Sequence, residues 1–188
     1  MYSTLYLVET VTIIVVVMIC PFMRRWLSKS RSILIGAALC VVAQLLFMAN
    51  PYSFEWCMVT TILRGIGQAP LSAFIFSMIG DVVEYGQWKT HIRQESFIFS
   101  GGSVGAKVGM GAAQAAITGI MTMCGYISST GADVVQPQMA IDSIRYIYIF
   151  APIILMVLAM IVCALYRLDK MYPSIMKDLK EREAQGTL

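Results

Sequence analysis

Three charged side chains, Glu9, Arg64 and Lys107, stand inside long apolar stretches of the sequence. An ionisable group inside a bilayer costs at least about 2.5–3.5 kcal/mol, and it usually faces a cavity or a group of opposite charge. Lys107 lies eleven residues beyond Ser96, which is about 17 Å along a helix and close to the middle of a ~30 Å hydrocarbon core. We expect Lys107 to face a cavity or to pair with carboxylates elsewhere in the protein; a purely structural pair that holds helices together is the alternative.

Glu9 and Arg64 lie nearer the opposite membrane surface than Lys107 does. Counted back from Arg24 and Asp81, they lie about 22 Å and 25 Å from the inner boundary of the hydrocarbon core. Both are therefore expected in the outer third of the membrane. Either the two charges pair, or each side chain extends separately to the outer interface.

Small and polar residues accompany these charges. Glycines at four-residue spacing, a pattern that permits close helix approach, occur in the stretch that holds Lys107; they are Gly101, Gly105 and Gly109. Gly102 and Ser103, about one turn before Lys107, leave room for a ligand. The stretch that holds Arg64 contains Gly65, Gly67 and Pro70, which we expect to interrupt or kink its helix. Gln68 is a polar group in that stretch that can reach a cavity.

The composition identifies the solvent of these elements as lipid. Of 188 residues, 58% are apolar and 13% are charged, and the mean hydropathy is +0.72, whereas roughly a quarter of a soluble domain is charged. The five cysteines and the lone histidine, His91, show no metal-ligand or redox spacing. Five apolar runs reach the length needed to cross a bilayer; they are 2–21, 33–49, 56–80, 96–124 and 143–166. The sequence therefore predicts an all-α integral membrane protein with five transmembrane helices.

Basic residues gather in alternate connections between these runs, which predicts the orientation of the chain. The connections after the first and third runs and the C-terminal tail hold Arg24, Arg25, Lys29, Arg31, Lys89, Arg93, Arg167, Lys170, Lys177, Lys180 and Arg182. The C-terminus is therefore expected in the cytoplasm. Five spans then place Met1 outside, so we expect at least one further helix upstream.

Acidic and basic residues alternate between the third and fourth runs, over the sequence GDVVEYGQWKTHIRQES at 80–96. On their chemistry alone, these residues form either a salt-bridged clamp at the cytoplasmic surface or a solvated loop whose exposed pairs contribute about 0–1 kcal/mol each. The residues concerned are Asp81, Glu84, Tyr85, Lys89, Arg93 and Glu95.

This pattern, D-x-x-[DE]-Y-G-x-x-K-x-x-x-R-x-E, resembles the loop between helices ten and eleven of the glycoside–pentoside–hexuronide:cation symporters. That family is the melibiose-carrier-like branch of the major facilitator superfamily. Lys107 in the next helix, the pair Gly125 and Tyr126 that closes it, and the basic segment 24–29 are similar to the family as well. The resemblance covers essentially the whole chain.

The resemblance implies that the five runs are helices eight to twelve of a twelve-helix carrier. Residues 1–170 would form part of its C-terminal bundle and 171–188 a cytoplasmic tail. The carrier would move a sugar or glycoside with Na⁺ or H⁺ by alternating access, in the plasma membrane and without enzymatic activity. The missing N-terminal half would hold most of the cation site, so no metal ligand and no other cofactor are expected here, nor any nucleic acid. An accessory multi-pass subunit without transport activity of its own is the alternative.

The resemblance also implies roles for the residues singled out above. The family's lysine in this helix is linked to substrate and cation coupling, and the resemblance extends that role to Lys107. On their own chemistry and position, Ser103, Gly102 and Gln68 complete the predicted substrate site, where Ser103 can hydrogen-bond a sugar hydroxyl. The 81–95 segment becomes a cytoplasmic gate. Because helices eight and ten should be neighbours in such a carrier, Glu9 and Arg64 are predicted to form an ion pair.

Overall fold

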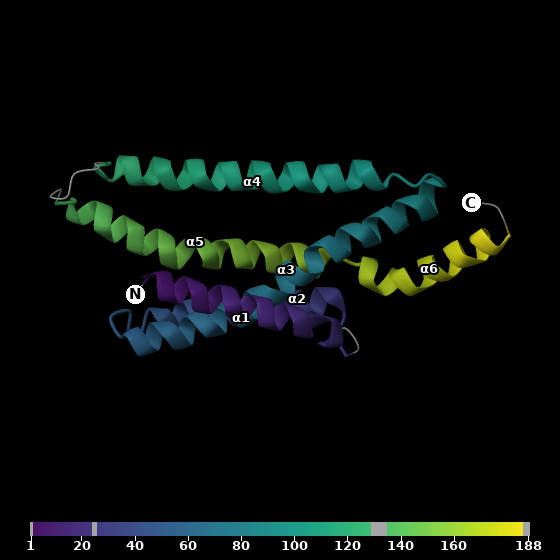
Figure 1. The fold of residues 1–188 in the computed structure, drawn as a ribbon. Coiled ribbons are helices and arrows are strands. Elements are labelled where there is room, and N and C mark those ends of the chain that lie inside the picture. The colour runs from purple at the N-terminus through teal and green to yellow at the C-terminus, as the bar shows by residue number, and fades with distance from the viewer. Residues whose placement is uncertain (1, 24–25, 129–134, 186–188) are drawn as a thin grey trace.

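The computed structural model describes residues 2–23, 26–128 and 135–185, and every regular element in these ranges is a helix (Figure 1). The helices are α1 (Tyr2–Met23), α2 (Lys29–Phe47), α3 (Phe54–Thr90), α4 (Glu95–Met123), α5 (Gln138–Leu165) and α6 (Leu168–Ala184). The all-α prediction is confirmed. The tail expected after 170 is largely the sixth helix, α6. Arg24 and Arg25 lie outside the described residues.

Local signals set where the helices begin and end. Ser28 and Ser53 cap α2 and α3, each accepting a hydrogen bond from a backbone N–H three residues on. α3 ends at Thr90, and His91 caps it with a φ of 59° and an N–H that donates to the Gln87 carbonyl. With 37 residues, α3 is about 55 Å long, which is more than the thickness of a ~30 Å hydrocarbon core. The segment from Asp81 to Thr90, expected in a loop, is therefore the last part of α3.

Glycines allow α3 to pack closely on two neighbours. A Cβ on Gly67 would lie 2.6 Å from the Gly36 carbonyl oxygen and 2.8 Å from the Cys40 nitrogen, so only glycine lets α2 cross α3 here. A Cβ on Gly65 would lie 3.1 Å from the Thr12 side chain of α1. α3 continues through Gly65, Gly67 and Pro70, so the predicted interruption is wrong, whereas the kink expected at Pro70 stays a prediction. The glycines provide helix contact instead of a break.

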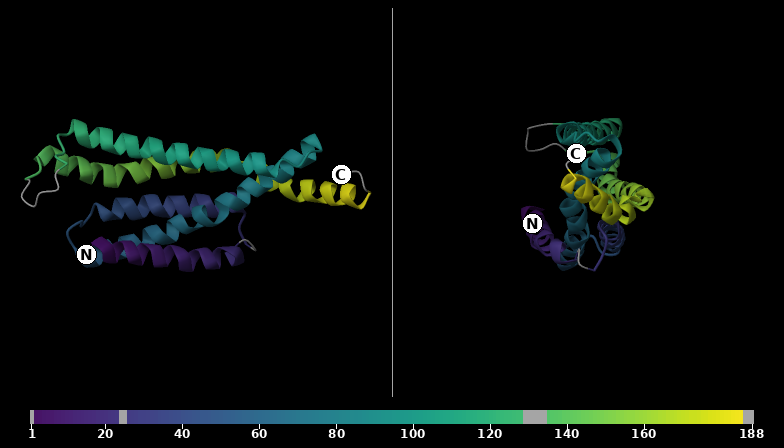
Figure 2. Two further views of the ribbon diagram at one scale, coloured as in Figure 1. Left: turned by 45° about the horizontal axis from the view of Figure 1, so that its top comes forward. Right: turned by 90° about the vertical axis from the view of Figure 1, so that its right-hand side faces the viewer.

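The helices divide into a packed group and one separate helix. α2 packs on α3 and α5, and α1 packs on α3. α6 lies against the second half of α3 and extends past the ends of α1 and α2 (Figure 2). We call the end of the molecule where α1 ends, α2 begins and α6 lies the basic end. The α2–α3 and α4–α5 connections lie at the other end (Figure 1).

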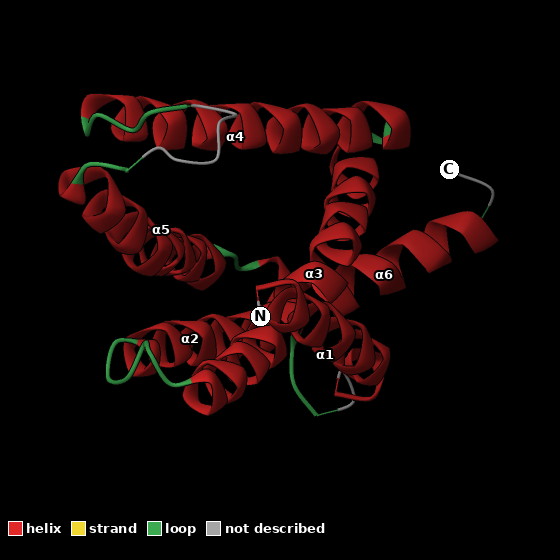
Figure 3. Ribbon diagram, turned by 60° about the vertical axis from the view of Figure 1, so that its left-hand side comes forward, coloured by secondary structure: helices red, strands yellow, loops and turns green. Residues whose placement is uncertain are grey.

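α4 stands apart from this group (Figure 3). It makes few contacts, with α3 and α5, and none of its described residues is buried. No atom lies within 4 Å of a Cβ built on Gly101, Gly105 or Gly109. The face of α4 that carries these three glycines therefore packs against no helix among the described residues.

Four of the described helices are long and apolar enough to cross a membrane: α1, α2, α3 and α5. α4 has the length, with 29 residues, but its glycine, serine, glutamine and lysine residues lower its hydropathy. Five spans were predicted, and α4 is the one that falls short of the apolarity of the rest. α1 and α5 expose large apolar side chains over most of their length, as lipid-facing helices do.

Candidate functional site

An ion pair inside the packed group joins α1 to α3. The Arg64 Nε lies 2.9 Å from Glu9 Oε1, and Nη2 lies 2.5 Å from Glu9 Oε2. Two parallel bonds of this kind form the strongest arrangement that a guanidinium and a carboxylate adopt. The side chains are 19% and 15% exposed. Gly65, next to Arg64, brings α1 close enough for the contact. The structure thus brings together the two charges that the sequence placed at similar depth.

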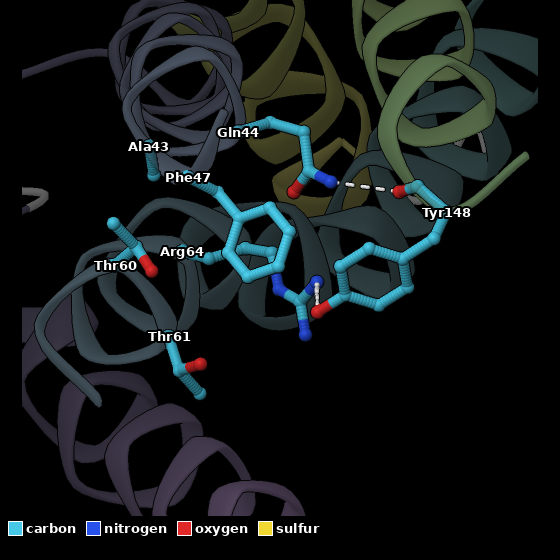
Figure 4. A pocket seen from close by; sticks show the side chains of 7 residues that line it. All are labelled: Ala43, Gln44, Phe47, Thr60, Thr61, Arg64 and Tyr148. Carbon is cyan, nitrogen blue, oxygen red and sulfur yellow. Dashed lines mark hydrogen bonds between the residues drawn. The ribbon is translucent and has the colours of Figure 1, made fainter. Parts of the chain in front are cut away.

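Tyr148 of α5 extends this pair into a larger network; Figure 4 draws its members Arg64, Tyr148, Gln44 and Phe47. Arg64 Nη1 donates to the Tyr148 hydroxyl at 3.0 Å, and Gln44 Nε2 donates to the Tyr148 carbonyl at 2.7 Å. The Phe47 ring packs edge-on against the Tyr148 ring, with centroids 5.3 Å apart. Gln44 is only 2% exposed. The network therefore ties four helices, α1, α2, α3 and α5, to one guanidinium.

A cleft of about 250 Å³ opens beside the ion pair. It is lined by Glu9, Cys40, Gln44, Arg64, Gln68, Pro152, Leu155 and Met156. The side-chain amide of Gln68 makes no hydrogen bond with any residue that the structure describes. A smaller hollow of about 40 Å³ borders Glu9, Arg64 and Tyr148 from the direction of Tyr6 and Thr61. Mostly apolar walls with a few placed polar groups are typical of small-molecule sites.

The other residues predicted to bind substrate lie on α4, away from this cleft. Lys107 is exposed. Ser103 donates its hydroxyl to the Phe99 carbonyl of its own helix at 3.0 Å. A Cβ on Gly102 would lie 3.0 Å from the Ile79 side chain, so Gly102 faces α3. No α4 residue lines the cleft, so the structure brings only Gln68 of the predicted substrate set to the Glu9–Arg64 pair.

A second ion pair closes the basic end. Lys29 Nζ lies 2.7 Å and 2.6 Å from the two carboxylate oxygens of Asp81, and the side chains are 6% and 5% exposed. Lys29 begins α2, whereas Asp81 lies on the helical continuation of α3. Asp81 therefore pairs across helices and not within its own segment.

The rest of the predicted clamp does not join this pair. Arg93 and Glu95 form their own ion pair at 3.1 Å, with both side chains 55% exposed. Lys89 is exposed, and Tyr85 is half-buried with its ring 6.0 Å from the Trp88 ring. One oxygen of Glu84 is buried without a hydrogen-bond partner among the described residues. The charges of 81–95 thus divide into a buried contact to α2 and an exposed contact beyond the end of α3.

α6 is fastened to the basic end by polar contacts. Asp169 accepts from the Ser30 backbone N–H at 2.8 Å, in the first turn of α2. The Trp88 indole donates to Asp178 at 3.1 Å, and Arg182 donates to the Trp88 carbonyl at 3.0 Å. Burial raises the pKa of the Tyr166 phenol, and the charges of Asp81 and Asp169 act in the same direction. The phenol at this junction therefore stays protonated at neutral pH.

Within the described residues, no group of three or more His, Cys, Asp or Glu side chains is placed to hold a metal ion. The two ion pairs and the cleft thus present hydrogen-bond donors, acceptors and paired charges. Such groups can bind a polar solute and can break and reform when helices move.

Comparison with known proteins identifies the family to which this chain belongs. The family described as MFS/sugar transport protein matches residues 1–170. The chain belongs to this family. The match includes both ion pairs, the cleft and α4, and it confirms the resemblance to the glycoside–pentoside–hexuronide branch of the superfamily. A member of this transporter family is a multi-pass membrane protein and not an enzyme.

Two relatives show how far the similarity extends. The isoprimeverose transporter of Lactiplantibacillus pentosus is 30% identical over 171 residues, which cover 90% of this chain and 35% of the relative. The glucuronide carrier protein homolog of Escherichia coli (strain K12) is 29% identical over 165 residues, covering 87% of this chain and 35% of the relative. The chain therefore spans about a third of the length of the curated relatives it matches.

Sequence reasoning did not find two members of the Arg64 network, Gln44 and Tyr148. Each is a polar group inside an apolar run, where an unpaired hydrogen-bonding group is costly. That cost is the signal that could have identified them. The sequence marks Lys29 as one of the basic residues that set orientation and as part of the family-like segment 24–29, but nothing in its spacing relates it to Asp81.

Proposed function

We propose that this chain is part of a secondary carrier that moves a sugar or glycoside together with a monovalent cation by alternating access. This proposal is supported by the family match over residues 1–170 and by two relatives whose names refer to isoprimeverose and to a glucuronide. The observation that carries the proposal is the cleft beside Glu9 and Arg64, since a mostly apolar hollow with a few polar groups, placed between membrane-spanning helices, offers a solute a place to bind.

Alternating access assigns a role to the contacts at the basic end of the molecule. The contacts at the basic end, around Lys29, Asp81 and α6, hold the helices together when the carrier is closed on that side. Rocking of the two halves breaks and reforms such contacts. We place the basic end and the C-terminus in the cytoplasm of a bacterial plasma membrane. Na⁺ or H⁺ binds mainly to the part of the carrier that this chain does not include.

A chimera tests this function. Residues 1–188 replace the matching third of the isoprimeverose transporter, and uptake of radiolabelled isoprimeverose is measured in proteoliposomes with an inward Na⁺ gradient, an inward H⁺ gradient or neither. We expect uptake above the no-gradient level with one of the two gradients. If the chimera inserts and elutes as a folded carrier but transports nothing under either gradient, the chain serves as an accessory subunit.

Lys107 provides a sharper test within the same chimera. We expect Lys107→Ala to lower cation-coupled uptake at least tenfold, because an ionisable group inside the membrane usually faces a cavity or a charge partner. Insertion should be unchanged, because Lys107 is exposed and none of the described residues of α4 is buried. Lys107→Arg keeps the charge and should retain part of the activity. Unchanged uptake and coupling in Lys107→Ala would remove Lys107 from the transport site.

A further inference from the structure

We propose that the cleft beside the Glu9–Arg64 pair binds one ring of a neutral sugar and discriminates against acidic sugars. This inference rests on the proposed function and narrows its substrate class. It concerns a site built by α1, α2, α3 and α5, to which α4 contributes nothing.

The charge of the cleft argues for a neutral ligand. Arg64 and Glu9 are the only charged residues among its lining residues, and they neutralise each other through two hydrogen bonds. An anionic ligand would have to displace Glu9 from the guanidinium or lie beside its carboxylate. Like charges at close range in a low-dielectric site repel each other strongly. Sugar hydroxyls, which both donate and accept, can bind to the pair without separating it.

Gln68 supplies the polar group that is ready for such a ligand. Its amide borders the cleft and has no hydrogen-bond partner in the described part of the chain. Gln68 is half-buried, and neither of its side-chain polar atoms is among the buried unpaired ones, so two adjacent sugar hydroxyls can reach its donor and its acceptor. Gln44, at the same cleft, already uses its amide N–H to hold the Tyr148 carbonyl. Gln68 is thus free to bind, whereas Gln44 holds the wall in place.

The remaining walls fit the apolar face of a sugar ring. Pro152, Leu155 and Met156 of α5 line the same cleft as the polar groups, so a ring can place its C–H face on them and its hydroxyls on Gln68 and the ion pair. The cleft, of about 250 Å³, lies near the lower end of the roughly 300–1,000 Å³ that small-molecule sites occupy, a size that suits a single sugar ring.

The test compares two sugars that share a ring, D-xylose and D-glucuronate, which carries an added carboxylate. Binding to the whole 188-residue chain in nanodiscs is measured by saturation-transfer NMR over a range of sugar concentrations. We expect saturable D-xylose binding at least tenfold tighter than D-glucuronate binding. Gln68→Leu, which keeps the bulk of the side chain, should weaken D-xylose binding about five- to tenfold with the melting temperature in detergent unchanged.

Glu9→Gln tests the charge argument directly. It leaves Arg64 without a counter-charge, so D-glucuronate should now bind more tightly than D-xylose. Glu55→Gln is the matched control, because Glu55 is an exposed acid in the first turn of α3, and it should keep the preference for D-xylose. If Glu9→Gln fails to fold, Gln68→Leu decides the question.

Three results would overturn the inference: no saturable D-xylose binding, D-glucuronate binding as tight as D-xylose binding in the unmodified chain, or no effect of Gln68→Leu. The chimera described above separates this outcome from failure of the proposed function. A chimera that transports sugar while its selectivity is indifferent to Gln68 and Glu9 retains the function and refutes the cleft. A chimera without transport refutes the function, whatever the chain binds in nanodiscs.

Discussion

Two ion pairs connect α3 to a neighbouring helix, and they differ in what surrounds them. Lys29 and Asp81, at the basic end, are 6% and 5% exposed and lie beneath α6. Glu9 and Arg64, in the middle of the packed group, are 19% and 15% exposed and border two hollows. The first pair is enclosed by protein, whereas the second leaves space for a ligand on both sides. A buried pair surrounded by protein fixes helices, and one beside a cleft can also serve binding.

Removing one partner of the enclosed pair should have the largest effect on stability. Asp81→Asn leaves the Lys29 ammonium buried without a counter-charge, and such a loss costs about 3–5 kcal/mol. We expect a marked fall in the melting temperature of the detergent-purified chain and in its yield. The double variant Lys29→Met with Asp81→Leu removes both charges and should recover most of the loss. A double variant as unstable as Asp81→Asn would mean that the pair itself, and not the orphaned charge, holds this end together.

Arg64→Ala should destabilise less than Asp81→Asn. It leaves Glu9 unpaired and removes the donor to Tyr148, but the neighbouring hollows let water reach the carboxylate, so we expect about 2–3 kcal/mol. Arg64→Lys keeps the positive charge but cannot form the bidentate contact with Glu9, so it should recover about half of the lost free energy of unfolding. Arg145→Ala is the control, because Arg145 is exposed on α5 and lies over the ring of the exposed Tyr52, so its loss should cost no more than ~1 kcal/mol. The melting temperatures of all four variants give the ranking, and equal losses in Arg64→Ala and Asp81→Asn would erase the distinction between the pairs.

The two pairs also show what the sequence can predict. The depth of Glu9 and Arg64 follows from counting residues along apolar helices, and their pairing was predicted once the resemblance made their helices neighbours. Lys29 and Asp81 belong to connections whose geometry residue counting does not determine. The dense charges of 81–95 suggested a loop, yet no proline occurs between Asp81 and Thr90, and α3 continues through this segment beyond the apolar core.

Lys107 marks the other limit of sequence-based prediction. Its depth along α4 follows from residue counting, but which helix faces it depends on packing. α4 buries none of its described residues and brings Lys107 to no partner that the structure describes. Gln44 and Tyr148 were missed for a related reason: a polar side chain in an apolar run signals that it needs a partner without indicating which one.

The smallest effect is expected at the exposed pair beyond α3. Arg93 and Glu95 are both 55% exposed, so water solvates each charge well and the pair contributes little. Arg93→Ala should change the melting temperature by an amount equivalent to at most ~0.5 kcal/mol, and adding 0.5 M NaCl should remove even that difference by screening. The same variant in the chimera is more informative, because a gate needs a contact that forms in only one state. A stable Arg93→Ala variant with impaired sugar uptake would assign Arg93 to the moving parts of the carrier. Unchanged uptake would leave Lys29 and Asp81 as the ion pair that closes the basic end.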